Sequence, residues 1–310
     1  MTKKLPTDGF ELDALMERVD AKLASEGVPI TLRPMLALGA ISDEFETAIP
    51  MSEPFRDEDT SSPLAKNWPF VQQALRWYDD RYGDRLLHDP RPGRVAFLLH
   101  QTPWVLYLPR IFGRVEPVAS RTLKSEGIRT DGGPPAYNVL DGIEGLTEQL
   151  KRSLSEVELG EMFALFQLGY NALTTMEYLC PNVLVEAAMA DINTAVDHIM
   201  ARNPSYGQSR WASLQATEKV LKACTELKRG KYSLTHHLQQ ICAEASSVGI
   251  PTPPQEDIDA IQCSASVRYG TESTTLNEAI SAHHASLRVC LLAAKHVHQH
   301  LKTSQLSGSR

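Results

Sequence analysis

The chain has 310 residues, of which 42% are apolar and 22% charged, a composition typical of a folded protein with a sizeable core. The formal net charge of −7 excludes a protein that coats nucleic acid over its whole surface, and it leaves room for a local basic face. No run of about 18 apolar residues occurs, and no apolar stretch follows the basic residues of Met1–Pro6. We therefore expect neither a membrane-spanning helix nor a signal peptide.

The first 180 residues mix helical and strand patterns. Apolar spacing predicts helices over residues 11–26 and 68–82, separated by an exposed loop at residues 52–62. Two short strands, Arg94–His100 and Trp104–Leu108, are expected to pair as a hairpin, and Arg114–Val118 is a candidate third strand. A loop at residues 130–137 precedes one helix on Val139, Ile143, Leu146 and Leu150, and another that begins at a capping box, Ser155 to Glu158. We expect residues 1–180 to form an α+β N-terminal region.

The last 130 residues are helical in pattern throughout. Five segments with three- and four-residue apolar spacing lie between Val183 and Leu301, and short breakers such as Asn203-Pro204 separate them. The pattern predicts a mainly α protein in which residues 181–303 form an antiparallel bundle and residues 304–310 a disordered tail. The predicted core includes one residue or more from each of the last four helices: Leu221, Leu238, Ile261, Leu287 and Val297.

The bundle carries three short motifs in a recognisable order: Ser213–Ala223 (SLQATEKVLKA), His236–Leu238 (HHL) and Val267–Gly270 (VRYG). The set resembles the HEPN domain, the nucleotide-binding helical domain of higher eukaryotes and prokaryotes, over about the last two-fifths of the chain. His237 departs from the family pattern, which usually has Asp there. The resemblance implies a nucleotide- or RNA-binding bundle that forms homodimers and, in bacteria, serves toxin–antitoxin or phage-defence systems.

Catalytic members of that family cut RNA without metal, using an Arg followed a few residues later by His. Arg229 and His236 have such a spacing, with His as the acid or base and Arg at the phosphate. A metal-independent endoribonuclease is therefore one alternative function, and a purely structural dimerisation module is another. The non-functional interpretation is that Arg229 is a basic residue at the end of one helix and that His236 lies in the first turn of the next helix.

Further candidates for ligand binding lie around this pair. Lys219 and Lys222 share a helix face that would suit a phosphate, although a solvated basic face has the same pattern. His237, Arg268 and Tyr269 are the remaining candidates, and no cofactor is expected. His296 and His300 share a face but supply only two ligands, so no metal site is expected.

The five cysteines, Cys180, Cys224, Cys242, Cys263 and Cys290, are odd in number and widely spaced. They are interpreted as free thiols in a reducing compartment, which predicts a cytoplasmic protein.

Overall fold

A computed structural model describes residues 4–6, 8–50, 63–86, 91–111, 114–125 and 134–307. The chain divides into two compact units, Met1–Asp89 and Pro90–Arg310. The boundary expected near residue 180 thus lies inside the second unit. The strands of the predicted N-terminal region belong with the helical bundle, and each unit is described by itself below.

The described residues of the first unit form three helices, α1 (Gly9–Ser25), α2 (Arg33–Glu44) and α3 (Pro63–Tyr82), with short 3-10 turns at Ile30–Leu32 and Gly83–Leu86. Their apolar faces form a separate core that includes Met16, Leu38, Ile41 and Val71. Pro34 lies in the first turn of α2, where the missing N–H costs no helical hydrogen bond. The loop predicted at residues 52–62 lies outside the described residues.

In the second unit, a β-hairpin is buried on both faces. Strands β1 (Gly93–Leu99) and β2 (Thr102–Leu108) pair antiparallel, which confirms the two predicted strands to within two residues at their ends. The intervening His100 and Gln101 have φ of 51° and 62°, the left-handed conformation of a two-residue turn that matches strand twist. A Cβ on Gly169 of α5 (Glu156–Glu177) would lie 2.4 Å from Val95 Cγ2, so this glycine lets the helix pack directly on the hairpin.

The segment that follows the hairpin differs from the sequence prediction. Strand β3 (Glu116–Val118) pairs in parallel with β4 (Ala136–Asn138) and not with the hairpin. The single helix expected over residues 139–150 is wrong: a 3-10 turn (Val139–Gly142) and a short helix α4 (Glu148–Ser153) replace it. Ile143 instead forms a β-bridge with Leu106, and Gly145 turns the chain at a φ of 73°.

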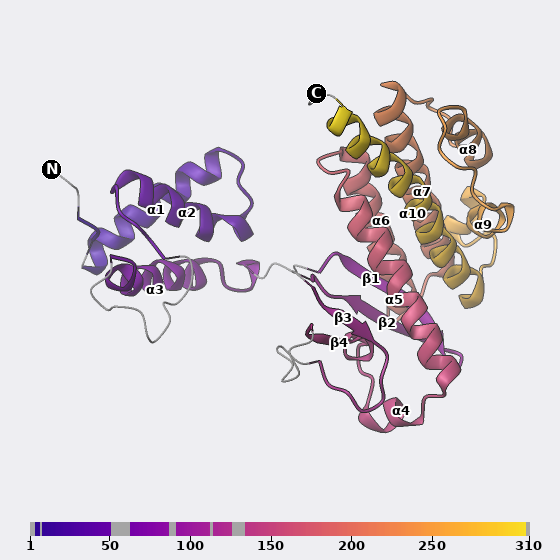
Figure 1. Cartoon of the computed structure of the whole chain (residues 1–310), viewed down its shortest axis with the longest axis horizontal. Helices are drawn as coiled ribbons and strands as arrows, with labels where there is room; N and C mark the ends of the chain where they lie inside the picture. Colours follow the sequence, from indigo (N-terminus) through magenta and orange to yellow (C-terminus); the bar gives the residue numbers. More distant parts are fainter. Residues whose placement is uncertain are drawn as a thin grey trace. The chain divides into compact units, whose positions relative to one another are not determined.

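The remaining helices form the predicted bundle (Figure 1). They are α6 (Val183–Met200), α7 (Tyr206–Arg229), α8 (Leu238–Ser247), α9 (Gln255–Ile261) and α10 (Leu276–Ser307), with a 3-10 turn η4 at Ala265–Tyr269. Residues 183–303 are all described and contain no strand, and the five predicted core residues are all buried. Helix α7 packs against α6, α8 and α10, so it is the central helix of the unit.

Helix α10 is longer than expected and its apolar seam is covered within the chain. Residues 304–307, predicted as disordered tail, belong to this helix, and residues 308–310 lie outside the described part. The seam residues Ile280, His283, Leu287, Cys290, Ala294 and Val297 are all buried against the same chain. Apolar surface left over on this seam therefore gives no reason to expect a partner copy along that length.

Candidate functional site

A pocket of about 480 Å³ lies on the central helix, and three chain segments line it. Helix α7 contributes Trp211, Leu214, Gln215 and Glu218, which share one face because their spacing follows the helical repeat. His236 and His237, just before α8, form a second wall, and residues 262–265, between α9 and η4, form the third.

Two close contacts hold the third wall against α7. Arg210 Nη2 donates a hydrogen bond of 2.7 Å to the carbonyl of Gln262, and Gln208 Nε2 donates one of 2.9 Å to the carbonyl of Arg268. A Cβ on Gly207 would lie 2.1 Å from the carbonyl oxygen of Val267, so any side chain there would push η4 away. Gly207 therefore sets the distance between α7 and this wall.

The most unusual group in the pocket is the carboxylate of Glu218. Its side chain is 7% exposed, and Oε1 accepts a hydrogen bond of 2.7 Å from Lys222 Nζ, which is equally buried. Oε1 also contacts His236 Nδ1 at 2.9 Å. Oε2 is buried and has no hydrogen-bond partner among the described residues. An unpaired buried carboxylate oxygen costs free energy, which a donor arriving with a ligand would recover.

His236 covers this carboxylate from the solvent side. Its side chain is 80% exposed, so its polar contact with Glu218 is what orients the ring. When Glu218 is ionised it can only accept, so Nδ1 carries the proton and donates. An exposed imidazole held through one hydrogen bond can turn aside at low energetic cost.

The structure brings together only part of the predicted site. Lys222 and His236 bond the same carboxylate, and His237 lines the pocket beside them. Lys219 lies elsewhere on α7 and forms an ion pair with Asp191 of α6. Because Lys219 and Lys222 both have carboxylate partners, the basic face predicted for this part of α7 is internally neutralised.

Arg229 is not part of the pocket lining. It forms an ion pair with Glu244 of α8, and that carboxylate also accepts the backbone N–H of Ser233 at 3.2 Å. Burial opposes ionisation of Glu244, but the Ser233 hydrogen bonds and Arg229 hold its pKa below the usual value. Arg229 follows Glu218, the partner of His236, by eleven residues on α7, about 16 Å of helix axis. The two predicted catalytic residues are thus bound to different carboxylates at different levels of the helix.

Arg268 and Tyr269 lie at the end of η4 and contact each other. The Arg268 guanidinium lies 5.8 Å from the centre of the Tyr269 ring, and that ring is largely exposed. Neither residue lines the pocket, although the turn that carries them does.

The cysteine thiols and the possible metal ligands can each be compared with what catalysis or metal binding would require. Burial raises the pKa of the Cys263 thiol to about 11, so it stays protonated at neutral pH and is a weak nucleophile. All five cysteines are free, as predicted from their spacing. Among the described residues no group of three or more His, Cys, Asp or Glu side chains is arranged to hold a metal ion.

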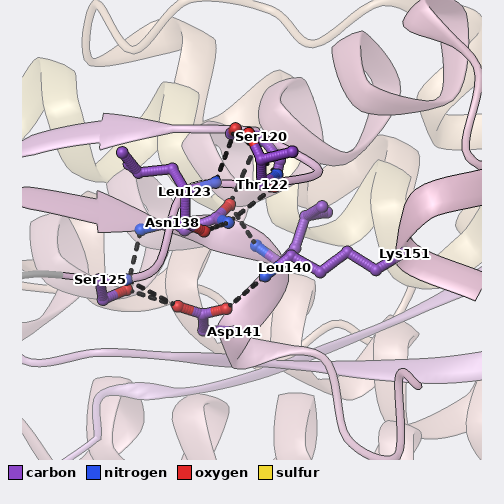
Figure 2. Close-up of polar contacts among 8 residues, drawn as sticks. All are labelled: Ser120, Thr122, Leu123, Ser125, Asn138, Leu140, Asp141 and Lys151. Atoms are coloured by element: carbon purple, nitrogen blue, oxygen red, sulfur yellow. Dashed lines mark hydrogen bonds and ion pairs between the residues drawn. The ribbon is translucent and has the colours of Figure 1, made fainter. Parts of the chain in front are cut away.

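A second polar cluster lies around Asn138 of β4 (Figure 2). The buried Asn138 amide accepts from the backbone of Ser120 and Leu140 and donates to the carbonyls of Ser120 and Leu123. Asp141 accepts from Lys151 at 2.9 Å and from the Ser125 hydroxyl at 2.7 Å. Because the Asn138 amide has all its hydrogen bonds within the chain, the cluster explains how residues 120–125 are held and makes no demand for a ligand.

His236 and His237, both candidates from the sequence, line this pocket, whereas Lys222 lies outside its lining, and Trp211 and Glu218 were not singled out from the sequence as pocket residues. The available signal was the spacing of Trp211, Gln215 and Glu218 on one face, together with the four-residue step from Glu218 to Lys222.

Comparison of the chain with protein-family models, with curated proteins and with solved structures finds no match. Among the described helices, none has both the length and the apolar character that crossing a bilayer requires.

Proposed function

We propose that the second unit binds a nucleoside or nucleotide, with the base in the pocket on α7. The observation that supports this most strongly is the pocket itself: an indole, two imidazoles and two side-chain amides line it together with a buried carboxylate that lacks one hydrogen bond. Its volume of about 480 Å³ lies within the usual range of small-molecule sites. Aromatic faces stack on bases of any sequence, and the polar groups would select their edges. The resemblance to HEPN domains implies the same class of ligand.

The distribution of charge favours a small ligand over a long RNA. Residues 1–89 hold 10 of the 31 basic and 17 of the 38 acidic residues, so they carry the whole net charge of −7. The second unit is neutral, and its cations Lys219, Lys222 and Arg229 have carboxylate partners. RNA binding draws most of its affinity from phosphates neutralised by Lys and Arg, and these residues are already neutralised.

The proposal is tested by equilibrium dialysis of the full chain against labelled nucleosides and nucleoside monophosphates, with a short single-stranded RNA in parallel. Trp211→Ala should weaken binding by about 1–3 kcal/mol because the base loses its stacking partner. Leu234→Ala is the matched control, since Leu234 is exposed near the pocket but outside its lining. Binding that is equal in both variants would refute the pocket. Cleavage of the RNA in EDTA, lost in His236→Ala, would favour the endoribonuclease instead.

A further inference from the structure

The oxygen Oε2 of Glu218 is a buried acceptor at the pocket, and no described residue donates a hydrogen bond to it. The other oxygen already accepts from Lys222 in an ion pair and contacts His236, so the carboxylate is anchored on one side only. An ionised carboxylate accepts and never donates, and its two oxygens together can take about four hydrogen bonds. A matching ligand must therefore present hydrogen-bond donors, and two adjacent N–H groups would match both oxygens at once.

We infer that Glu218 selects a guanine-type base by accepting hydrogen bonds from its N1–H and its 2-amino group. This inference rests on the proposed function. Among the four common bases, only guanine carries two adjacent N–H donors on its pairing edge. Adenine and cytosine place a ring-nitrogen lone pair beside their amino group, and uracil flanks its single N–H with carbonyl oxygens. Each of these three would set a lone pair against the carboxylate, which is unfavourable in a site shielded from water.

Access to the carboxylate requires His236 to move. Oε2 has no contact with solvent in the unliganded chain, and His236 contacts the neighbouring oxygen from the solvent side. Because the imidazole is 80% exposed, it can rotate out and leave its place on Oε1 to a base N–H. Lys222 stays in position and keeps its ion pair with the carboxylate. His236 acts in this arrangement as a displaceable cover, competing with the base for the same acceptor.

The test compares ligands on the unaltered full chain, so that its outcome does not depend on a variant that folds. Calorimetric titrations use guanosine, inosine, which lacks the 2-amino group, and adenosine, which lacks both donors. Guanosine should bind at least about tenfold more tightly than inosine, and adenosine should be weaker again, since each hydrogen bond to a charged group is worth roughly one order of magnitude or more. Equal affinities, or a preference for adenosine, would overturn the inference and leave the proposed function standing. The absence of binding by any nucleoside here and by any nucleoside monophosphate in the dialysis would overturn both.

Two variants add independent signatures. Glu218→Gln replaces one acceptor oxygen with an amide donor, so the preference for guanosine over adenosine should fall at least about tenfold. Circular dichroism checks that this variant is folded. His236→Ala removes the imidazole that competes for Oε1 and should therefore bind guanosine more tightly than the unaltered chain. An unchanged or lower guanosine affinity in His236→Ala would contradict the role of His236 as a displaceable cover.

Discussion

Replacing Glu218 by alanine should destabilise the second unit strongly, because the change strands a buried ammonium group. The side chains of Glu218 and Lys222 are both 7% exposed, and Nζ and Oε1 are 2.7 Å apart. The nearest other support for the charge is the Tyr232 ring, whose centre lies 5.8 Å from Nζ. Breaking a buried ion pair from one side typically costs about 3–5 kcal/mol, and a cation–π contact at this distance recovers only part of it.

The matched variant removes both charges together. Glu218→Leu combined with Lys222→Met leaves no buried charge and keeps the volume similar, so most of the lost stability should return. Urea unfolding followed by circular dichroism measures both variants, and the first unit, which has its own core, provides a transition that should not move. A loss below about 1 kcal/mol in the single variant would refute the reasoning, because it would mean that Lys222 reaches water without its partner.

Three further changes probe other parts of the second unit. Gly207→Ala should lower stability and also weaken nucleoside binding, because a Cβ 2.1 Å from the Val267 oxygen displaces one wall of the pocket; unaltered unfolding and binding would contradict this packing. Burial and a neighbouring histidine lower the pKa of His283 to about 3, so the unfolded chain gains a proton between about pH 6.5 and 3 that the folded chain cannot accept. Relative to His283→Leu, stability should therefore fall with decreasing pH in that window by at most about 1.4 kcal/mol per pH unit, measured by urea unfolding at several pH values. Arg229→Ala should cost less than about 1 kcal/mol, since its ion pair with Glu244 is partly exposed, and should leave nucleoside affinity unchanged; a tenfold loss in dialysis would restore its predicted role at the ligand.

Local signals in the sequence predicted the helices of the second unit well. The capping box predicted at Ser155 appears as reciprocal hydrogen bonds with Glu158, at 2.7 Å from the Ser155 N–H and 3.3 Å from the Glu158 N–H. Gly230 ends α7 with a φ of 77°, after the two basic residues of its last turn. Such signals succeed because each depends on a few neighbouring residues and a fixed helical geometry.

The domain boundary could not be found in the same way. The hairpin near residue 100 has apolar residues on both faces, with Phe97 on one side and Ala96 on the other, so it needs cover from two directions. The cover comes from helices that are 60 to 190 residues further along the chain, among them α5, α6 and α10. Periodicity shows that a face must be covered but not which distant segment covers it. The same limitation misassigned residues 139–150, where pairing of Ile143 with Leu106 overrides an apolar spacing that suits a helix.

The pocket shows why residue type and spacing alone overestimated the positive charge that this site can offer to a ligand. A glutamate four residues before a lysine has the same pattern whether the pair lies in water or in the interior. Here the irregular stretch from Gly230 to His237 returns along α7 and brings His236 onto Glu218, and no periodic signal marks that return. Once Lys222 is buried against this carboxylate, its charge is no longer available to a phosphate. The site then offers an acceptor where the sequence suggested a donor, which is why we propose a ligand defined by the N–H groups of a base more than by the charge of a backbone.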